Sequence, residues 1–334
     1  MFIWFGEVTE GLPTAAGSEK QKRTFRIPPQ NVEVFLHPSL LTHILYDMIL
    51  LVMQMNKITT LILPLLLLSG CQSKPVMLHA FSTDKTMFRN APTHLHYSES
   101  QMEEILASYD HQEPSEWGER VSGVLTSFET AKKEIALTFD ACGGPHGSSV
   151  DDELITYLIN EEISSTLFVN GRWIDENPAL FKKLAENPLF EIENHGTHHL
   201  PLSVNGQSAW GITGTTSVEE VVAEMKMNEN KIEEYTGEKP TLFRSGTAYY
   251  DDVAVDIANS LGIQIVNYTI LGDAGATYTS EQVKQALLKA TPGDIALLHM
   301  NQPDSGTADG VQQAVPILQE KGYSFVQLHN QNLQ

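Results

Sequence analysis

The sequence predicts an α/β barrel of seven parallel strands, on three observations. Strand and helix patterns alternate from residue 134 onward, which is typical of parallel strands joined by helical crossovers. The segment 134–140 has no charge between Ile135 and Phe139 and ends in Asp140, as expected of a buried strand that stops at a polar residue. Four later predicted strands also end at, or run into, Asp, His or Arg. The carboxyl ends of barrel strands share one rim, where such folds place their active sites.

Apolar periodicity and turn residues place the individual elements in order. A short helix at residues 98–109 and an edge strand at 121–127 precede the barrel. The barrel strands are predicted at 134–140, 165–170, 189–194, 241–244, 263–269, 294–299 and 323–328. The helices between them are predicted at 150–162, 178–186, 218–235, 251–261, 280–290 and 310–320. Residues 133–330 are therefore expected to form a single domain, and an open doubly wound sheet is the alternative that periodicity does not exclude.

The composition indicates an acidic globular protein. Of 334 residues, 41% are hydrophobic and 19% are charged, which is ordinary for a chain that buries a core. Asp and Glu number 42 against 21 Lys and Arg, a formal net charge of -21. Such a surface repels phosphate backbones, so no nucleic-acid partner is expected. The two cysteines, Cys71 and Cys142, each have a sequence context that explains them without a disulfide. The protein is also expected to be a monomer.

Residues 55–71 resemble a bacterial lipoprotein signal peptide. Lys57 precedes an apolar core at 58–68, and the run Leu68-Ser69-Gly70-Cys71 resembles a lipobox, whose cysteine becomes the lipidated first residue. The apolar core is too short to span a bilayer comfortably. The alternative is one anchor helix over 44–68, but charged and polar residues and a proline interrupt it.

A signal peptide at 55–71 would separate two further segments, residues 1–54 before it and residues 72–132 after it. Residues 1–54 are expected to be a mis-extended translation start without structure, because an export signal normally opens the translated chain. Residues 72–132 are expected to be a disordered tether followed by a lead-in to the barrel. The predicted location is the cell envelope, with the protein anchored to the membrane through lipid on Cys71, at the outer membrane or the periplasmic face.

Polar residues at the ends of five predicted strands define the candidate site. They are Asp140 after the first strand, the run Asn194-His195-Gly196-Thr197-His198-His199 after the third, Arg244 after the fourth, Asp273 after the fifth and His299 after the sixth. Because all five strand ends lie on one rim of a barrel, we expect a single cluster of carboxylate, imidazole and guanidinium groups there.

These motifs resemble the five signature motifs of the polysaccharide deacetylases of carbohydrate esterase family four, the NodB-homology domain. Thr138-Phe139-Asp140 matches the first motif, His195 and His199 the second, Phe243-Arg244 the start of the third, Asp273 the fourth, and Leu297-Leu298-His299 the fifth. The match covers roughly residues 134–328. The resemblance implies a distorted (β/α)7 barrel and a metal-dependent hydrolase that removes acetyl groups from N-acetylated sugars.

The substrate that the resemblance implies is an N-acetylglucosamine-containing polysaccharide of the cell envelope, either peptidoglycan or a chitin-like oligosaccharide. Two alternatives stay open. The chain could be a lipid-anchored carbohydrate-binding protein with a degraded metal site, or an O-acetyl esterase on the same scaffold. Retention of Asp140, Arg244, Asp273 and His299 favours an enzyme, because binding alone needs no acid and no base.

The residues support this chemistry independently. His195 and His199 are four residues apart, so a helical turn would place both imidazoles on one side, ready to hold one divalent metal, expected to be Zn²⁺. Asp140 is expected to act as the general base and His299 as the general acid. Arg244 is expected to keep Asp140 charged. Asp273 is expected to keep His299 protonated, and His198 is expected to face away from the metal.

The first motif departs from the family pattern, because Ala141 stands where the family has a second aspartate, usually the third metal ligand. The third ligand therefore stays open between four nearby residues, Asp140, Cys142, His146 and Asp151. Side chains alternate along an extended backbone, so Cys142 would share the side of Asp140 if the strand continued through it. The favoured interpretation of Cys142 is nevertheless a small buried hydrophobe beside a glycine turn.

Two loops on the same rim bear on the substrate. The third motif continues as Ser245-Gly246-Thr247-Ala248 where the family usually has Pro-Pro, which affects the expected shape of the substrate site. The loop 200–217 is long and rich in small polar residues, and its Trp210 could stack on a sugar ring or pin the loop to the barrel. The segment 170–173, which contains Trp173, offers a second such platform.

Overall fold

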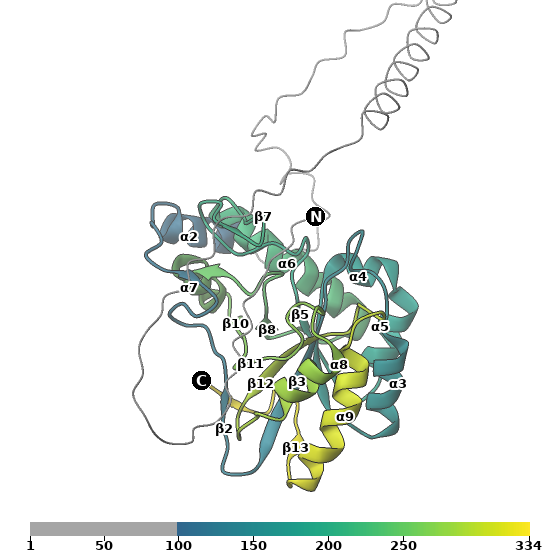
Figure 1. Cartoon of the computed structure of the whole chain (residues 1–334). Coiled ribbons are helices and arrows are strands. Elements are labelled where there is room, and N and C mark those ends of the chain that lie inside the picture. The colour runs from purple at the N-terminus through teal and green to yellow at the C-terminus, as the bar shows by residue number, and fades with distance from the viewer. Residues whose placement is uncertain (1–98) are drawn as a thin grey trace, which may run out of the picture. The chain divides into compact units, whose positions relative to one another are not determined.

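The computed structural model describes residues 99–334, which form an α/β fold around one curled parallel sheet (Figure 1). Seven strands lie in the order β10-β8-β5-β4-β3-β12-β11. They are β3 (Glu134–Ala141), β4 (Ser165–Val169), β5 (Phe190–Asn194), β8 (Leu242–Phe243), β10 (Gln264–Ile265), β11 (Ile270–Leu271) and β12 (Ile295–His299). All six neighbouring pairs are parallel. An eighth strand, β13 (Ser324–Phe325), pairs with the beginning of β3.

The strand order identifies a barrel. The first strand of the set, β3, lies between the second, β4, and the last of the seven, β12, so the order is cyclic in sequence. A doubly wound sheet would instead reverse its winding direction at a switch point. The predicted distorted (β/α)7 barrel is therefore confirmed, and the open-sheet alternative does not apply.

The distortion lies at the seam between β10 and β11, which stand at the two ends of the hydrogen-bonded order. The lead-in segment spans this seam, because Leu125 pairs with Val266 on one side and Ser127 pairs with Asp294 on the other. The predicted edge strand at 121–127 is therefore wrong as a continuous element. Its backbone turns at Gly123, whose φ is +86°, and its later residues bond to two different partners.

Short antiparallel strand pairs join segments that lie outside the parallel sheet. β1 (Trp117–Gly118) pairs with β9 (Tyr250–Asp251), and β2 (Phe128–Glu129) pairs with β14 (Asn332–Leu333). A small hairpin, β6 (Ser208–Ala209) with β7 (Ile212–Thr213), occupies the loop that the sequence left without structure. The strand predicted at 263–269 is strand only at β10, and β11 begins just beyond its predicted end. After β10, the carbonyls of Val266 and Asn267 accept hydrogen bonds from the Arg244 guanidinium.

Helices cover the outside of the sheet, as Figure 1 shows for α3, α5, α8 and α9. The helices are α2 (Glu99–Tyr109), α3 (Asp152–Asn160), α4 (Gly171–Glu176), α5 (Pro178–Ala185), α6 (Val218–Thr236), α7 (Asp252–Ser260), α8 (Ser280–Leu287) and α9 (Thr307–Glu320). All but α4 were predicted. Five of them begin at a side chain that accepts a backbone N–H of the first turn, which are Asp151, Asn170, Ser217, Asp251 and Thr279.

Alternation along β3 decides which of its side chains reach the site. Ile135, Leu137, Phe139 and Ala141 belong to the apolar cluster that also contains buried residues of α3, α5 and α9. The intervening residues face the barrel interior, where Thr138 and Asp140 both accept hydrogen bonds from Arg244. Polar groups on this strand therefore reach the interior at even-numbered positions. Within residues 99–334, no helix is long and apolar enough to cross a membrane.

Candidate active site

A chain of contacts joins the six predicted site residues at the carboxyl rim of the barrel. Asp140 near the end of β3 and His299 at the end of β12 are register partners on neighbouring strands. Asp140 bonds to Arg244, which follows β8, and lies 3.7 Å from His195, measured from Oδ2 to Nε2. Two further contacts, His195 to His199 and His299 to Asp273, complete the set. The prediction that these strand ends meet is confirmed as a matter of geometry.

Asp140 is held ionised by a buried guanidinium. The Nη1 of Arg244 donates to Asp140 Oδ1 at 2.8 Å and to Thr138 Oγ1 at 2.8 Å. The rest of the guanidinium bonds to two backbone carbonyls, so the side chain is fully buried without an unmet donor group at Nε or Nη2. Burial opposes ionisation of Asp140, but the Arg244 charge lowers the pKa of this carboxyl below its usual value. A buried, charged carboxylate with a free Oδ2 edge suits a general base.

His299 is held by a second buried carboxylate. Asp273 Oδ1 lies 2.9 Å from His299 Nδ1, and Asp273 Oδ2 accepts the His299 backbone N–H at 2.7 Å. Thr307 also donates to Oδ2, at 2.9 Å. Burial alone would lower the pKa of His299, but the charge and hydrogen bond of Asp273 raise it well above its usual value. The raised pKa favours the protonated imidazole, and the Cys142 side chain hydrogen-bonds to His299 as well.

Three soft or borderline donor atoms meet beside Asp140. They are one side-chain atom from each of Cys142, His195 and His199, and all three lie within 4.8 Å of one another. Among the described residues, this is the group of three side chains that could together hold a metal ion. The Cys142 Sγ is 3.8 Å from His195 Nε2. The expectation that Cys142 is a buried hydrophobe is wrong. Cys142 is the first residue after β3, and its Sγ lies on the side of Asp140, because both side chains approach His195 Nε2.

The donor set fits a divalent metal ion. His195 Nδ1 lies 2.9 Å from the Arg244 carbonyl oxygen, which accepts a hydrogen bond from a protonated Nδ1. In this tautomer Nε2 carries the lone pair that can bind a metal ion. The Nε2 atom of His199 is buried and has no hydrogen-bond partner, which is unusual for an imidazole nitrogen away from water. Two nitrogens and one sulfur at this spacing match the ligands that zinc prefers, with a fourth position open.

Glu224 of α6, which the sequence reasoning missed, holds the histidine loop in place. Its buried carboxylate accepts the backbone N–H groups of His198 at 2.9 Å and of Leu200 at 3.2 Å. The His198 side chain bonds to the same carboxylate at 3.3 Å and is more than half exposed. His198 is therefore anchored to α6 and is not part of the donor set, as expected.

The unusual third motif is explained by close packing on His199. A Cβ at Gly246 would lie 2.4 Å from backbone and ring atoms of His199, so a side chain at this position is excluded. His199 itself has a φ of +66°, a conformation that costs energy for a residue other than glycine. The glycine thus permits the strained backbone that turns His199 toward His195.

Other candidates from the sequence are placed elsewhere. Asp151 is the N-cap of α3 and accepts the Leu154 N–H at 3.0 Å. The His146 side chain is exposed and lies outside the donor set. Trp173 is fully buried, and its indole N–H donates to the Ser149 carbonyl, so it is a core residue and not a platform for sugars. Neither Asp151 nor His146 belongs to the group of potential metal ligands that the described residues bring together.

Three aromatic side chains from separate segments lie beside the histidine loop. Tyr249 follows Gly246 by three residues, and its ring contacts Trp117 at 5.7 Å and Trp210 at 5.9 Å between centroids. Trp210 lies at the turn of the β6–β7 hairpin and is 75% exposed. An indole this exposed that is steadied by an edge contact offers a flat apolar face to a ligand.

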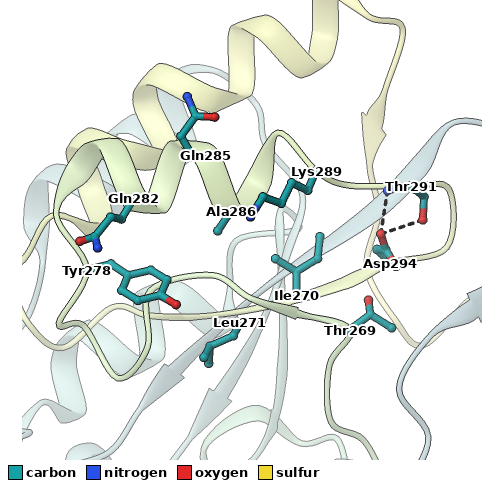
Figure 2. Close-up of a pocket in the computed structure, with 10 residues that line it drawn as sticks. All are labelled: Thr269, Ile270, Leu271, Tyr278, Gln282, Gln285, Ala286, Lys289, Thr291 and Asp294. Carbon is teal, nitrogen blue, oxygen red and sulfur yellow. Dashed lines mark hydrogen bonds between the residues drawn. The ribbon is translucent and has the colours of Figure 1, made fainter. Parts of the chain in front are cut away.

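A separate shallow pocket lies between β11 and α8 and takes no part in this site (Figure 2). Its lining includes Leu271, Tyr278, Gln282 and Lys289, and Asp294 at its edge bonds to Thr291. None of the six rim residues lines it.

Comparison with known proteins shows which proteins the barrel and its rim site resemble. Residues 128–266 match the family model for polysaccharide deacetylase. This match covers the first part of the barrel, and the fold is that of solved carbohydrate esterase family 4 structures.

Two curated relatives and one solved structure illustrate the match. The chain is 23% identical over 232 residues to the peptidoglycan-N-acetylmuramic acid deacetylase PdaA of Bacillus subtilis, which covers 65% of this chain and 80% of PdaA. It is 28% identical over 206 residues to the peptidoglycan-N-acetylglucosamine deacetylase PgdA of Listeria monocytogenes, 60% of this chain but 40% of PgdA. A family 4 pseudoenzyme from Bacillus anthracis superposes with a TM-score of 0.51 at 22% identity, over 61% of this chain and 67% of that one. This last likeness shows the fold alone.

Proposed function

We propose that the protein is a metal-dependent deacetylase that removes N-acetyl groups from an N-acetylglucosamine-containing polysaccharide of the cell envelope, peptidoglycan or a chitin-like oligosaccharide. One observation carries the proposal. A carboxylate kept ionised by Arg244 and an imidazole kept protonated by Asp273 are register partners on neighbouring strands, beside a set of metal donors. Hydrolysis of an amide requires a deprotonated general base and a protonated general acid at the same time.

The residues divide the reaction between them. When bound at His195 and His199, a divalent ion would supply an activated water and polarise the amide carbonyl. Asp140 takes the proton from the water oxygen as that oxygen bonds to the carbonyl carbon. His299 gives its Nε2 proton to the sugar nitrogen as the carbon–nitrogen bond breaks, which releases acetate and leaves a free amine. Arg244 and Asp273 touch neither reacting atom, and each holds the group that does.

The protonated His299 favours an amide substrate over an ester. An amine is a poor leaving group unless its nitrogen receives a proton, whereas an alkoxide leaves an ester more readily. Incubation of the full-length protein with N-acetylated chitooligosaccharides, peptidoglycan and O-acetylated xylan tests this preference by acetate release. The proposal predicts release from an N-acetylated glycan. Release from xylan alone would make the protein an O-acetyl esterase.

Asp273→Asn should move the alkaline limb of the pH profile to lower pH. Asp273 raises the pKa of His299, so in the wild type the general acid stays protonated as the pH rises through neutrality. The asparagine removes the charge, and the imidazole then loses its proton at a lower pH. Measurement of kcat against pH on one substrate checks the shift. An unchanged alkaline limb would show that another group limits the rate there.

Trp210→Ala should raise KM roughly 3- to 10-fold and leave kcat nearly unchanged, because a lost stacking contact is worth about 0.5–1.5 kcal/mol. The indole is exposed, and the ring that it contacts belongs to Tyr249, not to a proton-transfer group. Trp210→Phe, which keeps an aromatic face, serves as the matched control and should retain most of the affinity. A fall in kcat with an unchanged KM would instead assign Trp210 to the structure of the loop.

We further propose that the protein is anchored to the cell envelope by lipid on Cys71, which lies outside the described residues. The lipobox-like run ending at Cys71 supports this. Cys71→Ser should abolish both lipid attachment and processing after Gly70, so that the unprocessed precursor accumulates. Labelling with a radioactive fatty acid and the mobility of the band measure the two effects. Equal labelling and equal processing in the variant would refute lipidation at this residue.

A further inference from the structure

The sulfur of Cys142 occupies the side of the barrel from which a ligand is missing. Ala141 has no donor atom and packs in the apolar cluster on the helix side of β3. Cys142, one residue later, turns its side chain to the interior, where Sγ lies 3.8 Å from His195 Nε2. This distance is close to the separation of two atoms bound to one tetrahedral zinc ion at about 2.0–2.3 Å each.

The two histidines present their nitrogens to the same space. His195 has one nitrogen engaged by the Arg244 carbonyl, so its other nitrogen is the one that faces Cys142. The His195 and His199 rings meet edge to face, with centroids 5.0 Å apart, and the buried His199 Nε2 has no partner within the protein. The orphaned nitrogen is a second observation, independent of the cysteine, that indicates a ligand here.

We propose that Cys142 is the third protein ligand of the metal, so that this chain holds the ion with Cys142, His195 and His199. The thiolate of Cys142 takes the place of the carboxylate that the family pattern has one residue earlier, where this chain has Ala141 packed in the apolar cluster. The inference rests on the proposed function for the catalytic role of the ion. It is tested by metal binding and spectroscopy, so either can fail while the other stands.

A thiolate ligand changes which metals the site accepts. Sulfur and imidazole donors favour Zn²⁺ and Co²⁺, whereas Mg²⁺ and Mn²⁺ prefer oxygen ligands. The site should therefore bind Zn²⁺ and Co²⁺ and discriminate against Mg²⁺. It should also lose its metal when the thiol is oxidised or alkylated.

The alternative hypothesis is that the Cys142 sulfur is a catalytic nucleophile. His299 with Asp273 resembles the histidine and carboxylate of a cysteine hydrolase, so Cys142 could act as a nucleophile without any metal. Cys142→Asp separates the two roles. An aspartate can ligate zinc through oxygen, but it does not replace a thiolate in forming a thioester.

The experiment uses the full-length chain in a Cys71→Ser background, in which Cys142 is the one remaining cysteine. Co²⁺ is added to the metal-free protein, and the near-ultraviolet sulfur-to-cobalt charge-transfer band is recorded together with the bound metal. The parent should bind one ion with the band, and Zn²⁺ should protect its thiol from alkylation. Cys142→Ala should lose the band and bind at least about 10-fold more weakly. Cys142→Asp should bind the metal without the band.

Circular dichroism confirms that each variant is folded, and Cys142→Asp keeps the test valid if the alanine variant is not. A parent that binds Co²⁺ without the charge-transfer band, or a folded Cys142→Ala with unchanged affinity, overturns the proposal. Metal-free activity that alkylation abolishes would assign Cys142 as the nucleophile instead. A parent with the thiolate band that releases no acetate from any glycan would refute the proposed function and leave this inference intact.

Discussion

Asp140→Asn and His299→Ala should each lower kcat for acetate release by roughly 100-fold or more, because each removes one partner in proton transfer. Asparagine keeps a hydrogen-bond acceptor for the buried Arg244 guanidinium but has no basicity. Alanine at position 299 removes the donor that protonates the departing nitrogen. Single-turnover assays on one N-acetylated oligosaccharide measure both losses.

Asp151→Asn provides the matched control for these variants. Asp151 is also a buried aspartate, but it caps α3, and asparagine is an equally good N-cap. Its kcat should stay close to that of the wild type. Thermal unfolding shows whether the variants at 140 and 299 remain folded. Activity near the wild-type level in a folded variant at either position would contradict the assignment of acid and base.

Replacing His195 and His199 together by alanine should abolish both metal content and acetate release. The two imidazoles supply both nitrogen donors of the set, and one thiolate alone does not hold a catalytic ion. Elemental analysis of the purified protein and the acetate assay measure the two losses. Chelation of the wild type should have the same effect on activity, and added Zn²⁺ should restore it.

His198→Ala is the matched control, since this neighbouring imidazole bonds to Glu224 and stands outside the donor set. It should retain its metal. Because the Glu224 carboxylate also accepts backbone N–H groups of the loop, the loop should keep its place without the His198 side chain. Full metal content in the folded double variant would show that the ion is held elsewhere.

The sequence predicted the barrel because its central strands are apolar and buried. All eight residues of β3 except Glu134 are buried, and the strand ends within one residue of its predicted limit. The strand expected at 263–269 could not be predicted correctly from periodicity. Its interruption depends on Arg244, some twenty residues away, which takes two carbonyls out of the ladder. The edge strand predicted at 121–127 was wrong for a similar reason, because its residues form bridges to two segments that are distant in the sequence.

The candidate site was predictable where strand ends carry it. Asp140, Arg244, Asp273 and His299 each sit at, or just after, an apolar run, and a barrel brings such positions together. Glu224 was missed because nothing in the helix sequence marks one glutamate as the anchor of a loop some twenty-six residues away. The position of Cys142 beside His195 could not be predicted, because the residue follows the end of β3 and its side-chain direction depends on the turn that begins there. Trp173 was misjudged because an aromatic residue after a strand can point inward as readily as outward.

The measurement that tests the central claim most directly is the yield of acetate and of free amine from peptidoglycan or chitooligosaccharide treated with the Zn²⁺-loaded, full-length protein. The account predicts equal molar amounts of the two products, a requirement for Zn²⁺, and loss of both products in Asp140→Asn. A folded, metal-loaded wild type that binds these glycans but releases no acetate from any of them would contradict it, and the protein would then be a carbohydrate-binding member of its family.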